Sequence, residues 1–316
     1  MSMAESPEHQ PVLAEAAVAA LHPESSLRVV DATFGRGGHS QRILARLGGE
    51  AALLALDRDP EAVAFGQQAF ADDPRFRIRR TPFSRLAEAV AAEGWGDGVD
   101  AVLADLGVSS PQLDDAGRGF SFREGGPLDM RMDPEAGQSA AEWLAVVAEG
   151  ELQRVLRDYG EERFAKRVAR AIVAAREEGG GLRTTEQLAE VVRAAVPGRG
   201  EPGKDKATRT FQAIRMAVNA ELDELDAFLQ AAVTVLRPGG RLVVIAFHSL
   251  EDRAVKRFIR DEASDCVCPP DFPVCRCDKV ARLKPVGKPL RPEPAESEAN
   301  PRARSAIARV AERLAA

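Results

Sequence analysis

Short apolar runs alternate with helical patterns over the first third of the chain. Runs of strand length lie at Leu27–Val30, Ala52–Leu56, Phe76–Ile78 and Val99–Leu103. Apolar residues at three- and four-residue spacing predict helices at Pro11–Leu21, Ser40–Leu47, Pro60–Phe70 and Ser84–Ala92. Strands and helices that alternate in this way predict a parallel sheet with helices on both faces.

The pattern changes after the fourth strand, which ends at Asp105. Residues 106–134 are rich in glycine and predict a loop, and residues 139–197 carry only a helical pattern. Within this helical part, Thr184-Thr185-Glu186-Gln187 has the form of a capping box at the start of a helix. We therefore interpret residues 113–210 as an inserted all-helical domain.

The alternation of helix and strand then resumes. Asn219 is expected to cap a helix that runs to Leu236. A turn is predicted at Pro238-Gly239-Gly240, before a strongly apolar strand at Leu242–Phe247. The two parts of the predicted α/β domain are residues 1–112 and 211–316.

The first strand is directly followed by a glycine-rich turn, Asp31-Ala-Thr-Phe-Gly-Arg-Gly-Gly-His39. A strand, a glycine turn and a helix together leave free backbone N–H groups and a positive helix end facing a ligand. The second strand ends at Asp57, and nucleotide-binding α/β units place an acid for ribose hydroxyls about 20 residues after such a turn. The turn predicts a site for an adenosine-bearing cofactor, and a glycine turn without a ligand is the alternative.

The residues of the turn favour S-adenosylmethionine over a dinucleotide. The dinucleotide fingerprint has glycine at three positions, whereas Ser40 occupies the third position here. Asp31 would repel a pyrophosphate, but its carboxylate suits the cationic amino-acid end of S-adenosylmethionine. A nicotinamide-dependent dehydrogenase is thereby disfavoured.

Polar and aromatic residues follow the later strands. The third strand leads into Thr81-Pro82-Phe83, and the fourth leads into Asp105-Leu-Gly-Val-Ser-Ser-Pro-Gln112. Because ligands bind beyond the carboxyl ends of parallel strands, we expect these turns to share one edge with Asp31 and Asp57. The turn after the fourth strand could bind the polar edge of a substrate or cap a helix.

His248 follows the last apolar strand and is expected at the same edge. Its imidazole could act in catalysis or cap the next helix, and both interpretations stay open. A serine hydrolase is not indicated, because no G-x-S-x-G turn precedes Ser249.

Composition defines the general class of protein. The 316 residues are 45% hydrophobic and 29% charged, as in an ordinary globular protein long enough for two domains. The first ten residues lack the apolar core of a signal peptide, and no apolar run approaches the roughly 20 residues of a membrane span. We therefore expect a cytoplasmic protein with no membrane partner.

Basic residues concentrate in the C-terminal third, although the net charge of the chain is −6. They form three groups, within residues 199–215, 276–291 and 302–313. A solvated surface explains any one group, but three groups in an acidic protein suggest contacts with a phosphate backbone. The absence of interleaved aromatic residues argues against stacking on single-stranded bases.

All four cysteines lie within twelve residues, at Cys266, Cys268, Cys275 and Cys277. In a cytoplasmic protein such a cluster favours metal binding over disulfides. The C-x-C spacing is tighter than the usual C-x₂₋₄-C spacing of zinc sites. A zinc site and a set of reduced thiols therefore both stay open.

Seven stretches of the chain form a recognisable set. They are Thr33-Phe-Gly-Arg-Gly-Gly-His39, Asp105-Leu-Gly-Val-Ser-Ser-Pro-Gln-Leu-Asp114, Gly119-Phe-Ser-Phe122, Pro127-Leu-Asp-Met-Arg-Met132, Thr208-Arg-Thr-Phe-Gln212, Phe247-His-Ser-Leu-Glu-Asp252 and Asn300-Pro-Arg-Ala-Arg-Ser305. In this order they closely resemble motifs of the bacterial small-subunit (16S) ribosomal RNA cytosine-N4 methyltransferases. The resemblance runs from about residue 8 to the C-terminus.

The resemblance implies a fold and an activity. The fold is a class I (Rossmann-like) methyltransferase sheet with an inserted helical domain, which we expect to recognise the substrate. The activity is methyl transfer from S-adenosylmethionine to the exocyclic N4 amine of one decoding-centre cytidine in the 16S rRNA of the assembled small ribosomal subunit.

The resemblance also implies roles for single residues. Gly37, Gly38 and His39 would contact the methionine part of the cofactor, and Asp57 would hold the ribose. The other pocket residues would be Phe83 beside the adenine, Asp105 and Gln112. Some members of the family lack the cysteine cluster, so no essential catalytic metal is expected.

The implied chemistry requires a hydrogen-bond acceptor for the protons of the cytosine amine. This amine is a weak nucleophile, because its lone pair is delocalised into the ring. Our hypothesis is that Asp105, or a backbone carbonyl in the Leu106–Ser110 loop, accepts from the amine, and His248 is a further candidate catalytic residue. The Asn/Asp/Ser-Pro-Pro-aromatic signature of many amino methyltransferases is missing after the fourth strand.

Two rival interpretations concern other classes of chemistry. A non-catalytic RNA-binding or assembly factor is disfavoured by the joint presence of the glycine turn with Asp31, Asp57 and Asp105. Attack on cytosine carbon-5 by a thiolate is rejected, because the cysteines lie outside the strand ends. A monomer and a homodimer are both compatible with the sequence.

Overall fold

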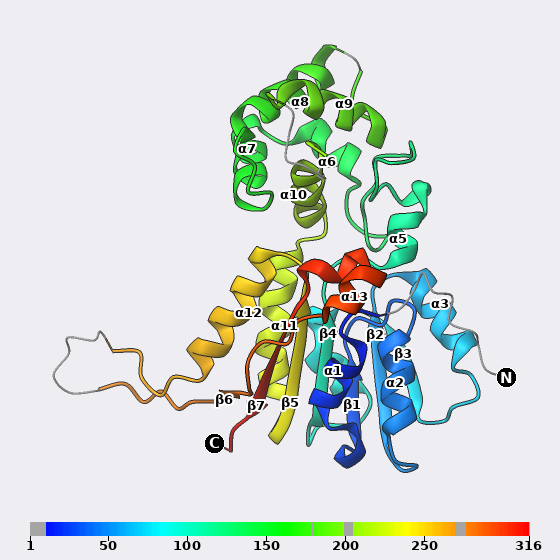
Figure 1. Cartoon of the computed structure of the whole chain (residues 1–316), viewed down its shortest axis with the longest axis vertical. Helices are drawn as coiled ribbons and strands as arrows, with labels where there is room; N and C mark the ends of the chain where they lie inside the picture. Colours follow the sequence, from blue (N-terminus) through cyan, green and yellow to red (C-terminus); the bar gives the residue numbers. More distant parts are fainter. Residues whose placement is uncertain (1–10, 179, 199–204, 269–275, 316) are drawn as a thin grey trace. The chain divides into compact units, whose positions relative to one another are not determined.

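The structure is a computed structural model that describes residues 11–178, 180–198, 205–268 and 276–315. The chain divides into two compact units (Figure 1). Unit 1 comprises Met1–Gly107 and Leu222–Ala316, and unit 2 comprises Val108–Glu221. No helix within the described ranges is long and apolar enough to cross a membrane.

Unit 1 is built on a seven-stranded sheet of order β3-β2-β1-β4-β5-β7-β6. The strands are β1 (Arg28–Asp31), β2 (Ala52–Asp57), β3 (Phe76–Arg80), β4 (Val99–Asp105), β5 (Leu236–Ala246), β6 (Leu283–Pro285) and β7 (Ile307–Arg313). β1 to β5 run parallel, and β7 runs antiparallel to β5 and β6. The parallel strands β1 to β5 confirm the predicted α/β sheet, and the antiparallel strands β6 and β7 were not predicted from the sequence.

Helices cover both faces of this sheet. They are α1 (Ala14–Leu21), α2 (Gly38–Arg46), α3 (Pro60–Ala69), α4 (Leu86–Ala92), α11 (Glu221–Val235) and α12 (Ser249–Glu262), whereas the short helix α13 (Pro294–Ala299) buries no residue. Along each inner strand, successive side chains point to opposite faces. Val30 and Leu54 pack with α4, α11 and α12, whereas Val29 and Leu53 pack with α1 and α2. Burial on both sides explains why these strands are continuously apolar in the sequence.

Two predictions about the later part of the chain are wrong in detail. Asn219 does not cap the helix that follows it. It ends the preceding helix, and its side-chain amide donates to the carbonyl oxygens of Met130 and Arg215 at 2.7 and 2.9 Å. The glycine turn at 238–240 lies inside β5, where the register to β4 shifts, so this strand begins at Leu236 rather than at Leu242.

Unit 2 is helical, as the pattern over residues 139–197 predicts. Its helices are α5 (Ser110–Asp114), α6 (Ala140–Val146), α7 (Glu149–Asp158), α8 (Ala165–Glu178), α9 (Thr185–Ala195) and α10 (Thr208–Val218). The predicted capping box at Thr184 is present at the start of α9. The expected loop over 106–134 contains the short helix α5, which Ser109 caps together with Gln112.

The end of unit 2 differs from the predicted boundary at residue 210. That boundary would divide α10, whose buried residues Phe211 and Ile214 belong to the apolar core of unit 2. A helix that buries its apolar face in one core moves with that core. Unit 2 therefore includes α10 and ends at Glu221.

Adjacent glycines give a matched test of packing in unit 2. A Cβ at Gly126 would lie 1.9 Å from the backbone oxygen of Ala116, whereas a Cβ at Gly125 would first meet the flexible carboxylate of Glu186 at 3.3 Å. Gly126→Ala should lower the free energy of unfolding by about 2–4 kcal/mol in urea denaturation followed by circular dichroism. Gly125→Ala is the control and should change it by less than about 1 kcal/mol. Equal effects of the two substitutions would contradict this account.

Candidate cofactor-binding and active site

The predicted site residues of unit 1 gather where the parallel strands end. Asp31, Asp57 and Asp105 are the last residues of β1, β2 and β4, and His248 follows β5. In Figure 1 these parallel strands lie side by side in the sheet. The edge predicted from the sequence is thus formed, and it holds residues that are far apart in the chain.

The glycine turn connects β1 to α2 and requires glycine at its centre. Gly37 has a φ of +75°, and a Cβ there would lie 2.8 Å from ring atoms of Phe34 and of Phe70. The turn is fixed to β2 through two backbone donors. Phe34 N–H donates to the carbonyl oxygen of Leu56 at 2.9 Å, and Gly35 N–H donates to Oδ2 of Asp57 at 2.8 Å.

The carboxyl group of Asp31 is buried and, among the described residues, accepts hydrogen bonds only from uncharged donors. Its Oδ2 accepts from the hydroxyl of Ser40 at 2.7 Å, and its Oδ1 accepts from Thr33 N–H at 3.3 Å. Burial raises the pKa of Asp31 to about 6, against the lowering effect of these two hydrogen bonds. A serine at the third position of the turn, where a dinucleotide site has glycine, therefore supports the acid.

Asp57 links the glycine turn to the start of α3. Its Oδ2 accepts from Gly35 N–H, and its Oδ1 accepts from Asp59 N–H at 2.9 Å. Each carboxylate oxygen has two lone pairs, so both can still accept from ribose hydroxyls. Burial raises the pKa of Asp57 to about 6 despite these hydrogen bonds, and the charge of Asp31 contributes to the increase.

Of the three acids, Asp105 has the fewest hydrogen bonds from the described residues to offset the cost of burying its carboxyl group. Its backbone N–H donates to Oγ1 of Thr33 at 2.6 Å, but its own Oδ1 is buried without a hydrogen-bond partner. Burial raises its pKa well above the usual range, and the charges of Asp31 and Glu251 raise it further. A side-chain exposure of 24% leaves the group open to a ligand.

His39 is a neutral neighbour of Asp105. Its Nε2 lies 3.2 Å from the carbonyl oxygen of Val12, which can only accept, so the proton is assigned to Nε2. Nδ1 then carries the lone pair and lies 3.8 Å from Oδ2 of Asp105. Burial lowers the pKa of His39 to about 4, so at neutral pH the ring supplies no positive charge to the acid.

The three acids together fit the predicted cofactor. Within the described residues, none of Asp31, Asp57 and Asp105 forms an ion pair with arginine or lysine. S-adenosylmethionine carries an ammonium and a sulfonium group, and either would offset the charge that burial disfavours. A pyrophosphate would add negative charge at the same place.

Phe83 and Gln112 are placed in different units. Phe83 follows β3, and its ring packs edge-to-face on Phe228 with a centroid distance of 5.1 Å. Gln112 lies in α5 of unit 2, where its side-chain oxygen accepts from Ser109 N–H at 3.0 Å. Within unit 2, Gln112 therefore caps the helix α5 together with Ser109. Its role in the cofactor pocket stays a prediction.

His248 is the N-cap residue of α12, as one of the two interpretations proposed. Its Nδ1 accepts from Glu251 N–H at 3.4 Å, and the carboxylate of Glu251 accepts from Phe247 N–H at 2.9 Å. The ring proton is therefore assigned to Nε2, which lies 3.0 Å from Oε1 of Glu251. In this state the imidazole can donate a hydrogen bond but has no open acceptor.

Three residues support the site through contacts that the sequence does not indicate. Thr33, Ser40 and Glu251 orient the strand ends through hydrogen bonds to Asp105, Asp31 and Phe247. Each is a short polar residue or a helix-capping acid, and such residues are abundant in any sequence. Only the spacing of Glu251 three residues after His248 gave a usable signal, that of a capping box.

The basic groups are partly used inside the protein. Arg309 forms two hydrogen bonds with Asp252, Arg215 forms two with Glu221, and Arg282 pairs with Glu262. The basic residues of unit 1 that remain exposed after β5 include Arg276, Lys284, Lys288, Arg291, Arg302 and Arg304. Of the predicted groups, Arg199 and Lys204 lie outside the described residues.

Comparisons with known proteins agree with this geometry. Residues 6–314 match the profile of the MraW methylase family. The chain is 57% identical over 310 residues to a protein from Thiobacillus denitrificans named ribosomal RNA small subunit methyltransferase H, covering 98% of each chain. It is 56% identical over 307 residues to a protein of the same name from Acidithiobacillus ferrooxidans, covering 96% of this chain and 94% of the relative.

The family profile matches nearly the whole chain, and the sequence identity to these relatives exceeds 50%. Neither chance nor a shared fold alone produces such similarity. The glycine turn, the three strand-end acids and the helical unit all lie within the matched residues. The chain therefore belongs to the MraW methylase family.

Proposed function

We propose that this protein transfers a methyl group from S-adenosylmethionine to the N4 amine of a cytidine in 16S ribosomal RNA. The relatives described above are named as methyltransferases of the small-subunit ribosomal RNA. The observation that carries the proposal is the trio of strand-end acids, which are raised in pKa and lack a cationic partner within the described residues. Such a trio suits a cationic methyl donor.

Each acid has a distinct part in the proposal. Asp31 attracts the cationic amino-acid end of the cofactor, while Asp57 accepts from the ribose hydroxyls and holds the glycine turn through Gly35. When bound, the cofactor supplies an electrophilic methyl group. Asp105 then accepts a hydrogen bond from the cytosine amine, and its raised pKa makes its ionised form a stronger proton acceptor.

Asp105 is a better candidate acceptor than His248. The side chain of Asp105 is 24% exposed, whereas Nδ1 of His248 accepts from the N–H of Glu251 and its Nε2 is buried. We therefore assign the proton acceptor to Asp105. His248 keeps the start of α12 in place, and its Nε2 is buried beside the carboxylate of Glu251.

The substrate is proposed to be the assembled small ribosomal subunit, with the cytidine at its decoding centre. Unit 2 is assigned to substrate recognition, because the chain enters it directly after Asp105 and Gly107. The exposed basic residues of unit 1 after β5 would contact phosphates. A ribosomal substrate also places the protein in the cytoplasm.

The proposed reaction can be tested directly on ribosomal particles. Small subunits from cells that lack this protein should gain label at N4 of one cytidine when incubated with the purified protein and methyl-labelled S-adenosylmethionine. Nucleosides are identified by mass spectrometry after digestion. Subunits from wild-type cells, which already carry the methyl group, serve as the control and should gain none. Label at another atom would reject the base assignment, and no label despite cofactor binding would favour the assembly factor.

Substitution of two acids should separate turnover from cofactor binding. Asp105→Asn removes the proton acceptor and should lower kcat by about 100-fold or more, with the cofactor Kd within about threefold of the wild type. Asp57→Asn replaces one of the two carboxylate oxygens that accept from Gly35 N–H and Asp59 N–H, and it should raise Kd by about tenfold, as measured by calorimetry. If Asp105→Asn reduced turnover and affinity equally, it would be a binding residue only.

Cofactor binding should depend on pH through the buried acids. Asp31 and Asp57 have pKa values of about 6 in the free protein, and a bound cation favours their ionised forms. The cofactor Kd should therefore be flat above about pH 7 and rise up to about tenfold per pH unit for each acid below about pH 6. Asp31→Asn should weaken binding and flatten the profile. The exposed Asp72→Asn is the control, and a wild-type Kd that is constant from pH 5 to 8 would refute the linkage.

A further inference from the structure

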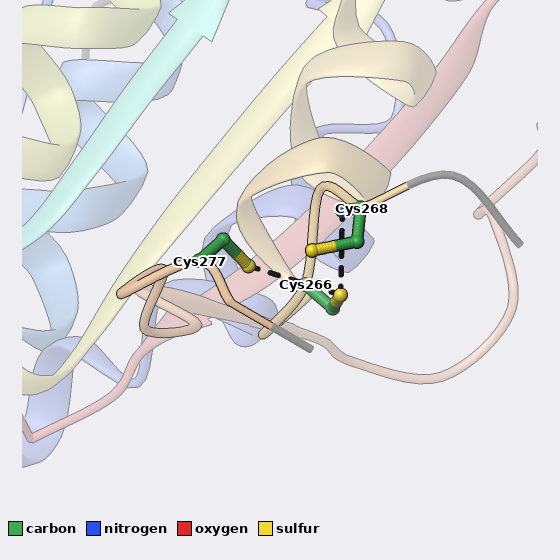
Figure 2. A group of neighbouring side chains, drawn as sticks. All are labelled: Cys266, Cys268 and Cys277. Carbon is green, nitrogen blue, oxygen red and sulfur yellow. Dashed lines mark hydrogen bonds between the residues drawn. The ribbon is translucent and has the colours of Figure 1, made fainter. Parts of the chain in front are cut away.

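Three cysteines outside the active site converge on one point. Cys266, Cys268 and Cys277 lie in the segment between α12 and β6, and their sulfur atoms are all within 4.8 Å of one another. Figure 2 shows the three side chains turned toward a common centre. The fourth cysteine, Cys275, lies outside the described residues.

The spacing of the sulfur atoms matches metal ligation. The sulfur atoms of Cys266 and Cys277 are 3.8 Å apart, far longer than the roughly 2.05 Å of a disulfide bond. Two thiolates bound to one tetrahedral zinc ion at about 2.3 Å are separated by about 3.8 Å. Since no pair exceeds 4.8 Å, a contraction of at most about 1 Å would place all three sulfur atoms on one ion.

Backbone donors point at the same sulfur atoms. Cys268 N–H donates to Sγ of Cys266 at 3.4 Å, and Val267 N–H donates to Sγ of Cys277 at 3.4 Å. Hydrogen bonds to the sulfur favour the thiolate, which is the form that binds metal. The tight C-x-C spacing, which argued against zinc in the sequence, is thus compatible with two sulfur atoms near one centre.

The ends of the segment are already attached to α12. Arg282 N–H donates to the carbonyl oxygen of Glu262 at 2.8 Å, and the Lys279 ammonium donates to the carbonyl oxygen of Asp261. On the other side, the Ser264 hydroxyl donates to the carbonyl oxygen of Cys266 at 2.6 Å. The thiols are thus held near one another by neighbouring contacts, which reduces the entropy that a metal must overcome.

We infer that Cys266, Cys268 and Cys277 bind one zinc ion, with a fourth ligand from another donor. Thiolates select soft or borderline ions, and zinc accepts their tetrahedral arrangement without redox chemistry. The 14 residues of α12 separate its start at the sheet edge from the cysteine segment by about 20 Å. The ion is therefore structural, fixing the segment between α12 and β6, and methyl transfer does not depend on it.

Metal content is the first test. The full-length protein, purified under reducing conditions without chelator, should contain about one zinc per chain by plasma mass spectrometry. The variant with all three cysteines replaced by serine should retain less than a tenth of that amount, as should Cys268→Ser alone. Val267→Ser, which changes an exposed residue between two of the cysteines, is the matched control and should keep the wild-type content.

Protease cleavage gives a second measurement that does not involve catalysis. Trypsin should cut after Arg276 and Lys279 at least tenfold more slowly in the zinc-loaded protein than after chelation, and the cysteine variants should show no such difference. Circular dichroism and cofactor affinity verify that the variants are folded. The inference fails if the wild type holds no zinc after incubation with zinc chloride and desalting, if the triple variant holds as much, or if the cluster carries iron or a disulfide instead.

Discussion

The desolvation cost of burying three carboxyl groups at the ends of the strands is the constraint on which the structure of unit 1 depends. Three strands end in aspartates at one edge of the sheet, where burial raises the pKa of each. Neutral donors such as the Ser40 hydroxyl and the Gly35 amide compensate part of that cost, and no lysine or arginine in the described residues pairs with them. A cationic ligand would offset the remaining desolvation cost, so the arrangement of these acids favours such a ligand.

Other features of the unit follow from this constraint. The turn must pass close to Asp57 for its amide to reach the carboxylate, and the positive φ of Gly37 lets it do so without a Cβ against the neighbouring aromatic rings. His39 is kept neutral, so it lies beside Asp105 without satisfying its charge. The parallel sheet provides the rigid base, because its inner strands are buried on both faces.

Helix α12 lies between the strand-end acids and the segment that contains the cysteines. Its first turn is capped by His248 and Glu251 at the sheet edge, and its last residues hold the segment that contains the cysteines. The thiols thus lie far from the acids, which agrees with a methyl transfer that uses no thiolate nucleophile. Three of the basic residues predicted to contact RNA, Arg215, Arg282 and Arg309, form ion pairs within the protein, so a count of charges overstates the basic surface that is available.

The sequence by itself determined the five parallel strands, the helical insertion and the edge at which Asp31, Asp57 and Asp105 meet, because these depend on apolar periodicity and on the rule that parallel strands end together. It did not predict the antiparallel strands β6 and β7. It could not decide between capping and catalysis for His248, nor place Asn219 at the end of a helix rather than at the start. Both depend on which backbone groups come within hydrogen-bond distance after folding. The tertiary structure alone decided that Ser40 and Thr33 support the acids and that three thiols converge, because the directions in which side chains point cannot be read from their spacing in the sequence.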